Sequence, residues 1–93
     1  MASDRDEQPR IEFLDNELDL CGTFLDTAAI EAGEPDAQAS ARAKAQQGYE
    51  TALVLMQYIR DVAERDRLTA RLNRLRERIE RFDQEVESRG TRE

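Results

Sequence analysis

The sequence predicts an all-α fold, and three observations support this prediction. Ala, Leu, Glu, Arg, Asp and Gln make up most of the 93 residues, which is a composition typical of long helices. Only two prolines and four glycines interrupt the chain. Apolar residues recur at alternating spacings of three and four, whereas β-branched residues never alternate with polar ones as a strand requires. We therefore expect one helical domain, residues 10–88, between disordered ends at 1–9 and 89–93.

The first helix is expected over residues 10–32. Its apolar positions form a seam of the kind that packs along another helix. These positions are Ile11, Leu14, Leu18, Cys21, Leu25, Ala28 and Ala32. Phe13, Leu20 and Phe24 widen this apolar face, so more than one neighbour can touch it. Gly33 and then Pro35 follow the last apolar position, which together make a strong signal for the end of a helix.

The second helix is expected to begin at Pro35, because proline suits the first turn of a helix. The short connection favours an antiparallel hairpin in which the numbers of facing residues sum to about 69 or 70. Cys21 then faces Gly48, and Leu18 faces Ala52. A structure with Cys21 far from Gly48 would contradict this register.

The helical pattern continues from Gly48 to Gly90 without glycine or proline. A second apolar seam lies there, made of Leu68, Leu72, Leu75, Ile79, Phe82 and Val86. We therefore predict an antiparallel helical hairpin with one long second helix, residues 35–62 continuing to 87. Its C-terminal part is coiled-coil-like, and this seam is the expected interface of a homodimer.

The seam slips by about two residues between Ile59 and Leu68, which rotates the apolar face or marks a change of direction. A turn near residues 61–66 would fold the last helix back onto the first two. A three-helix bundle is therefore the alternative architecture, and the direction of pairing in a homodimer stays open.

Charge is divided unevenly between the halves of the chain. Residues 1–50 hold 12 acidic and 4 basic residues, residues 51–93 hold 9 and 10, and the net charge is −7. Two charged stripes flank the apolar seams: one is Arg67, Arg71, Arg74, Arg78 and Arg81, and the other is Glu12, Asp15, Asp19 and Asp26. We predict that both stripes are docking surfaces. The acidic stripe, on the same or another chain, is the first expected partner of the arginine stripe.

The composition argues against an enzyme. The chain has no histidine, which is the commonest general base and metal ligand, and the single Cys21 cannot build a structural zinc site. No phosphate-binding glycine loop or nucleophile elbow is present. We expect no catalytic residue, no metal site and no cofactor. The polar start MASDRDEQPR, the lack of a long apolar run and the lone cysteine suggest a cytoplasmic protein without membrane contact.

One segment carries a family resemblance. The string AQQGYETALVL, Ala45–Leu55, resembles the second helix of a tetratricopeptide repeat, with its small residue at Ala45, its aromatic at Tyr49 and Ala52–Leu53 after it. The resemblance covers eleven residues, and Gly33 and Pro35 fall where the first helix of the repeat is continuous. It implies a helical hairpin with similar packing, and does not extend to a peptide-binding groove.

These observations predict a non-enzymatic helical protein–protein interaction or oligomerisation module, acting as a small adaptor or regulator. We expect a homodimer that also binds another protein. In one alternative the arginine stripe binds nucleic acid, which the interleaved Glu77, Glu80 and Asp83 and the net charge of −7 disfavour. In the other, the acidic helix imitates nucleic acid and inhibits a nucleic-acid enzyme.

Overall fold

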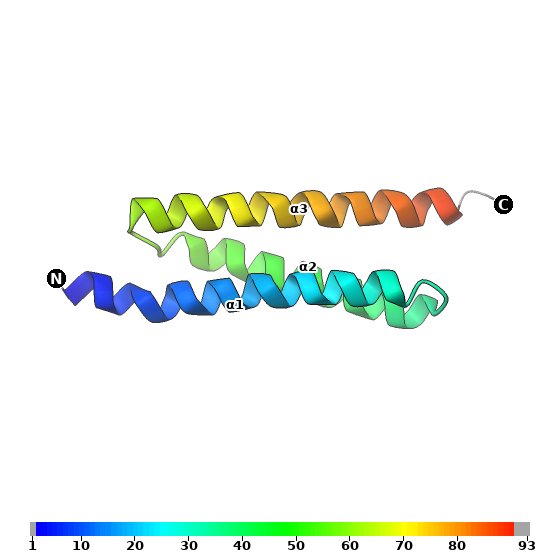
Figure 1. Cartoon of the computed structure of the whole chain (residues 1–93), viewed down its shortest axis with the longest axis horizontal. Coiled ribbons are helices and arrows are strands. Elements are labelled where there is room, and N and C mark those ends of the chain that lie inside the picture. Colours follow the sequence, from blue (N-terminus) through cyan, green and yellow to red (C-terminus); the bar gives the residue numbers. More distant parts are fainter. Residues whose placement is uncertain (1, 91–93) are drawn as a thin grey trace.

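Three helices packed side by side form the molecule, which measures 60 × 18 × 16 Å (Figure 1). The computed structural model describes the backbone of residues 2–90 and the side chains of residues 7–88. Helix α1 spans Ala2–Ile30, α2 spans Pro35–Met56 and α3 spans Val62–Gly90, with no strand in the described part of the chain. α2 runs antiparallel to both neighbours, so that α1 and α3 point the same way (Figure 1). The all-α prediction is confirmed.

The predicted long second helix, residues 35–62 continuing to 87, is wrong. α2 ends at Met56, residues 57–61 turn, and α3 begins at Val62. The N–H groups of Tyr58 and Ile59 donate to Leu55 and Met56, and Ile59 is buried. Burial of Ile59 at the turn and of Leu68 on α3 explains why the apolar seam slips between them. The arrangement is compatible with the three-helix bundle that the sequence left as the alternative.

The start of α3 is held by a local capping motif. Asp61 Oδ1 accepts the backbone N–H of Glu64 at 3.1 Å, and the carbonyl of Asp61 accepts the N–H of Arg65 at 2.8 Å. An aspartate followed three residues later by glutamate is the capping-box pattern, which supplies acceptors for the free N–H groups of a first turn. A helix can therefore begin here without glycine or proline.

α1 begins earlier than the sequence suggested. Residues 2–9, expected to be disordered, continue the helix. Pro9 lies inside it and removes one helical hydrogen bond, because proline has no backbone N–H. Glu7 explains part of this extension, because it is only 4% exposed and its carboxylate binds the turn between α2 and α3. At the other end α1 stops at Ile30, two residues before the predicted Ala32. Of the predicted disordered tail, residues 89–93, the first two continue α3, and residues 91–93 lie outside the described residues.

The predicted register of α1 and α2 is confirmed at its test position. A Cβ atom added to Gly48 would lie 2.5 Å from Cys21 Sγ and 3.1 Å from Glu17 Oε2, so the two backbones approach closely there. Nearer the hairpin turn, Gln38 Nε2 donates to the carbonyl of Ala28 at 3.0 Å. Of the three helix pairs, α1 and α2 share the most extensive contact.

Gly48→Ala is expected to lower the free energy of unfolding by up to about 2 kcal/mol. Alanine gains about 1 kcal/mol of helix propensity, but its methyl group overlaps the buried Cys21 sulfur, and overpacking costs about 1–3 kcal/mol. Chemical denaturation measures the change.

Gly33→Ala is the matched control, because nothing lies within 4 Å of the added atom and Gly33 has no positive φ. Cys21→Ala in the same chain removes the overlapping sulfur, so the double variant should be less damaged than the sum of the single ones. A Gly48→Ala chain more stable than wild type would contradict the close approach.

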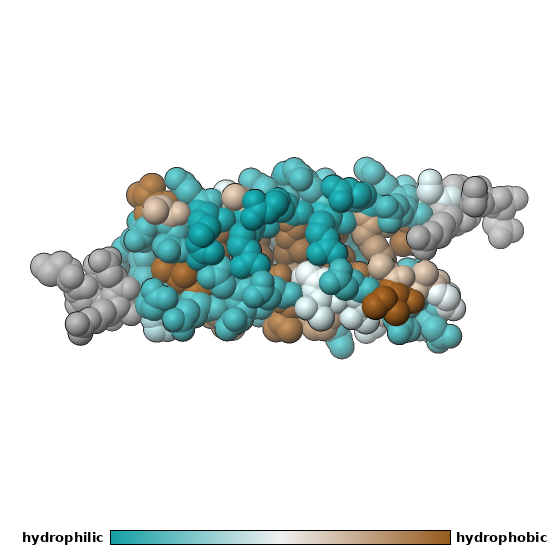
Figure 2. All heavy atoms as spheres, viewed as in Figure 1, coloured by the Kyte–Doolittle hydropathy of each residue, from teal (hydrophilic) through white to brown (hydrophobic). Residues whose placement is uncertain are grey.

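The core is one continuous cluster shared by the three helices. The members are Ile11, Leu14, Leu18, Cys21 and Leu25 of α1, Ala45, Ala52 and Met56 of α2, Ile59 of the turn, and Leu68, Leu72, Leu75 and Ile79 of α3. Phe24, Tyr49, Leu55 and Phe82 are half-buried against it. Figure 2 shows hydrophilic side chains over most of one face, with hydrophobic atoms visible between them.

Candidate interaction surfaces

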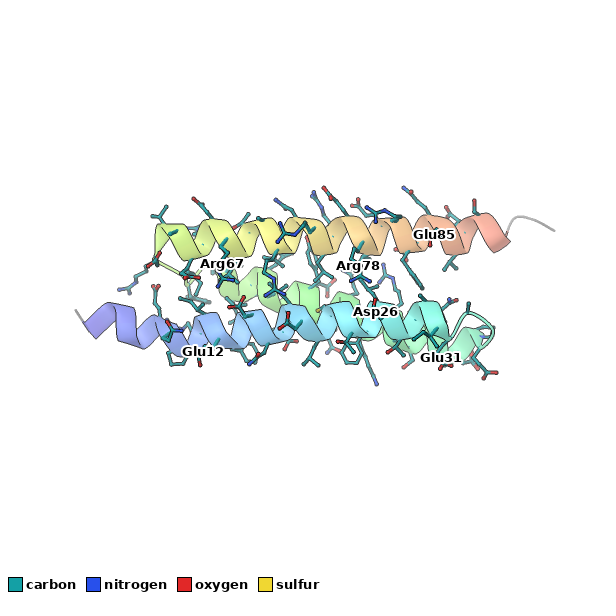
Figure 3. All side chains as sticks on the ribbon, in the orientation of Figure 1. Glu12, Asp26, Glu31, Arg67, Arg78 and Glu85 are labelled. Carbon is teal, nitrogen blue, oxygen red and sulfur yellow. The ribbon has the colours of Figure 1, made fainter. Side chains whose placement is uncertain are left out.

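A set of ion pairs joins α1 to α3 along one edge of the bundle. Arg67 Nη2 lies 2.9 Å from Asp15 Oδ2, and Arg71 reaches both Asp15 Oδ1 at 2.8 Å and Asp19 Oδ1 at 2.6 Å. Two turns further along, Arg78 Nη2 lies 2.9 Å from Asp26 Oδ1. Figure 3 shows Arg67 and Arg78 on the edge of α3 that faces α1, with Asp26 directed toward Arg78. We call these six residues the Arg–Asp ladder.

Asp15 is the aspartate of the ladder that accepts hydrogen bonds from two arginines, Arg67 and Arg71. The hydrogen bond from Arg67 lowers the pKa of Asp15, burial opposes this effect, and the hydrogen bond from Arg71 adds to it. The bonds to Asp15 and Glu64 correspondingly raise the pKa of Arg67. The ionised carboxylate of Asp15 is therefore stabilised by the fold.

Asp15→Asn is expected to reduce stability by about 1 kcal/mol at pH 7, the size typical of partly exposed pairs. The folded pKa of Asp15 is depressed, so its ionised form stabilises the fold above the unfolded pKa of about 3.9 and stops doing so as pH falls through the folded value. The stability gap between wild type and variant should therefore be complete at pH 7 and close below about pH 4. Denaturation between pH 2 and 7 measures it.

Asp66→Asn is the control, since Asp66 is an exposed aspartate of α3 outside the ladder. High salt should also narrow the gap for Asp15→Asn, because the pairs are partly solvated. A gap that stays constant down to pH 2 would show that Asp15 stabilises the bundle by something other than its charge.

The ladder contains most of the two predicted charged stripes. Arg67, Arg71 and Arg78 pair with Asp15, Asp19 and Asp26 of the same chain. The sequence had left open whether the two stripes meet within one chain or between two chains. Arg74 and Arg81 are exposed and form no ion pair with the residues that the structure describes. Glu12 lies outside the ladder and accepts a hydrogen bond from Gln8 at 3.2 Å. The stripes therefore face each other within the bundle over part of their length.

An open groove of about 380 Å³ lies beside the ladder, between α1 and α3. Gly22 has no side chain to fill it, and Leu18 and Leu75 also line it. Arg74 lines the same groove and is the one arginine there that is outside the ladder. The carboxylates of Asp19 and Asp26 stand among the arginines, so the groove carries both signs of charge.

The residues predicted to form the homodimer seam pack against helices of their own chain. Leu68, Leu72, Leu75 and Ile79 are buried in the core, and Phe82 and Val86 are half-buried. α3 folds back onto α1 and α2, so a second copy is not needed to cover these residues. A homodimer built on this seam would require α3 to leave the bundle.

The sequence analysis did not predict two tertiary contacts. Glu7 binds the α2–α3 turn, with its Oε2 2.6 Å from the N of Arg60 and its Oε1 3.1 Å from the N of Asp61. Arg42 forms a two-point contact with Asp83, at 2.9 and 2.6 Å, which fixes α2 to the far end of α3. Both contacts depend on the chain reversing at residues 57–61, and the capping-box pattern of Asp61 and Glu64 was the signal that could have located this reversal.

The part of the chain that the structure describes holds no group of three or more His, Cys, Asp or Glu side chains able to bind a metal ion. The one cysteine, Cys21, is buried beside Gly48, and burial, with the nearby Glu17 adding, raises its pKa to about 11. A protonated, enclosed thiol is a poor nucleophile.

A different surface is formed where α1 and α2 face away from α3. Phe13 and Leu20 on α1 are 47% and 50% exposed, and the half-buried Phe24 follows one turn later. On α2, Lys44 Nζ lies 5.7 Å from the centre of the Phe24 ring, which places the two side chains together across the helix pair. We call this surface the α1–α2 outer face. Its remaining α2 positions are uncharged: Ser40, Gln47, Thr51, Val54 and Leu55.

None of the described helices combines the length and the apolar composition needed to cross a bilayer. Comparison of the chain with protein-family models, with curated proteins and with solved structures found no match.

Proposed function

We propose that this chain is a non-enzymatic helical protein–protein interaction module, a small adaptor or regulator that docks another protein chain on its α1–α2 outer face. In this proposal the functional form is the three-helix bundle, in which α3 stabilises the hairpin of α1 and α2. The observation that carries the proposal is a line of large apolar side chains, Phe13, Leu20 and Phe24, that α1 leaves at least partly exposed on the outer face.

The contrast with the rest of the molecule supports this choice of surface. Charged residues are 38% of the chain, yet Glu17 and Lys44 are the only two near the middle of the outer face. Interfaces between proteins are depleted in charge at their centre and enriched in aromatic residues. Single exposed apolar residues are ordinary, but Phe13, Leu20 and Phe24 are aligned along one helix.

The charged stripes give less support to the other two functions. Three of the five stripe arginines have carboxylate partners in the ladder, so binding a phosphate backbone would compete with existing ion pairs. Asp15, Asp19 and Asp26 are the same partners, which leaves fewer free carboxylates to imitate nucleic acid. A salt-dependent shift with duplex DNA or RNA, abolished by Arg74→Ala, would favour the nucleic-acid alternative over ours.

A site-specific crosslink tests the proposal. A photoreactive p-benzoylphenylalanine replaces Phe13 on the outer face or, as the control, Glu77 on the exposed side of α3, and the full chain is irradiated in cells of its native source. We expect a covalent adduct with a protein from position 13 and none from position 77. Absence of an adduct at position 13, or equal adducts at both positions, would overturn the proposal.

A further inference from the structure

The outer face contains a second seam that the core does not use, which runs along α1 and ends one residue beyond it. Arg10, Phe13, Glu17, Leu20, Phe24 and Glu31 follow one another at spacings of three or four, with Thr27 completing the series. Residues so spaced lie along one side of a helix. The first seam of α1, which includes Leu14 and Cys21, is already buried against α2 and α3. α1 therefore has two packing faces, and only one of them is covered.

The charges of this second seam are arranged symmetrically about its centre. Arg10 and Glu31 lie at its two ends, equally far from the point between residues 20 and 21. Glu17 lies as far before that point as Phe24 lies after it, and Phe24 carries Lys44 over its ring. Reflection through this point therefore brings Glu31 level with Arg10, and Glu17 level with Lys44. None of these four charged residues forms an ion pair within the described chain.

We propose that the chain docked on this face is a second copy of the same protein. This inference rests on the proposed function and identifies the partner. The two α1 helices lie antiparallel, related by a two-fold axis that crosses them beside Leu20. Arg10 of each copy then lies level with Glu31 of the other, and Glu17 lies level with the other Lys44. Leu20 meets Leu20 at the axis, and Phe13 meets the small Thr27. An interface of this isologous kind requires self-complementarity, which is what the charge pattern provides.

The size of the face sets the expected affinity. From Arg10 to Glu31 the seam is about 30 Å long, and the face is two helices, roughly 20 Å, wide. Each copy would bury roughly 600 Å², somewhat below the roughly 800 Å² per partner of standard interfaces. We therefore expect a weak dimer that dissociates within the micromolar range, and the test must cover about 1 µM to about 1 mM.

Light scattering and sedimentation equilibrium over this range test the proposal on the full chain. The average mass should rise with concentration from 10.7 kDa to twice that value. Leu20→Glu places two carboxylates at the two-fold axis and should keep the chain monomeric at every concentration. Val62→Glu changes an exposed apolar residue on another helix and should dimerise as wild type does. Helical content by circular dichroism confirms that each variant is folded.

Charge reversal gives a readout that a general loss of stability would not produce. Arg10→Glu alone and Glu31→Arg alone each place like charges at both ends of the dimer and should weaken it about tenfold. An equimolar mixture of the two variants restores opposite charges at both ends. The mixture should therefore dimerise as well as wild type.

The outcomes separate this inference from the proposed function. A wild-type chain that stays monomeric to 1 mM, a dimer unaffected by Leu20→Glu, or a mixture no tighter than its components would each overturn the second-copy proposal. In that case a position 13 crosslink to a protein of different mass would leave the interaction module standing. A crosslink with the mass of two chains, lost on Leu20→Glu, would support both.

Discussion

Leu68→Ala is expected to lower the free energy of unfolding by about 2–5 kcal/mol. Leu68 is 0% exposed and lies in the first turns of α3, directly after Arg67 of the ladder. Removing its side chain leaves a cavity at the point where α3 first contacts the other two helices. Such a loss is a large fraction of the stability of a domain of this size. Urea denaturation, followed by circular dichroism, measures it.

The same experiment distinguishes an internal seam from an intermolecular one. Because the structure buries Leu68 within one chain, the unfolding midpoint of the variant should be lowered equally at every protein concentration, relative to wild type at that concentration. Val62→Ala, an exposed change on the same helix, should alter stability by less than about 0.5 kcal/mol. A Leu68→Ala chain that keeps its wild-type stability when dilute would contradict the internal packing of α3.

Glu7→Ala is expected to cost about 2–3 kcal/mol, because the backbone N–H groups of Arg60 and Asp61 lose a charged acceptor. Glu7 is the one charged side chain that is buried among the described residues. Its removal should also loosen the first turns of α1, since Pro9 weakens the helix there. Chemical denaturation and amide hydrogen exchange at residues 60 and 61 measure the two effects.

Two variants control for this prediction. Glu12→Ala removes an exposed glutamate from the same helix and should have little effect on stability. Glu7→Gln keeps an oxygen acceptor without the charge, so it should lower the free energy of unfolding by less than Glu7→Ala and by more than Glu12→Ala. If Glu7→Ala and Glu12→Ala unfold alike, Glu7 does not hold the turn.

Much of the first two helices could be predicted because their signals are local. Gly33 and Pro35 mark the first turn, and small residues on both helices fix the register that brings Cys21 against Gly48. Side-chain spacing alone also predicted that Asp15 and Asp19 were suitable partners for the arginine stripe. Periodicity identifies which residues share a face, and opposite charges identify which faces attract.

The second turn was harder to predict because its signals are tertiary. No glycine or proline lies between residues 56 and 62, and the turn is held by Glu7, which is more than fifty residues away in sequence. The slip between Ile59 and Leu68 indicated a change of direction, and it correctly marked the region. Propensity alone could not decide between a bent and a continuous helix, since the good helix formers Gln57 and Arg60 alternate there with weaker ones such as Ile59.

The location of the candidate site changed with the path of the chain. Once α3 folds back, Leu72 and Ile79 are covered by their own chain, whereas Phe13 and Leu20 of α1 stay about half-exposed. Phe13, Leu20 and Phe24 were visible in the sequence as a widening of the first seam. Their role as a separate surface depends on α2 and α3 both occupying the opposite side, which the sequence did not establish.

The central claim is that α3 reverses onto α2, and a distance between spin labels tests it most directly. Nitroxide labels on Ser40→Cys and Gln84→Cys, in a Cys21→Ala chain diluted with unlabelled protein, report on the two helices where Arg42 contacts Asp83. The fold predicts a separation below about 30 Å, because neighbouring helix axes lie about 8–10 Å apart. A continuous helix would place the labels about 66 Å apart, and that result would contradict the account.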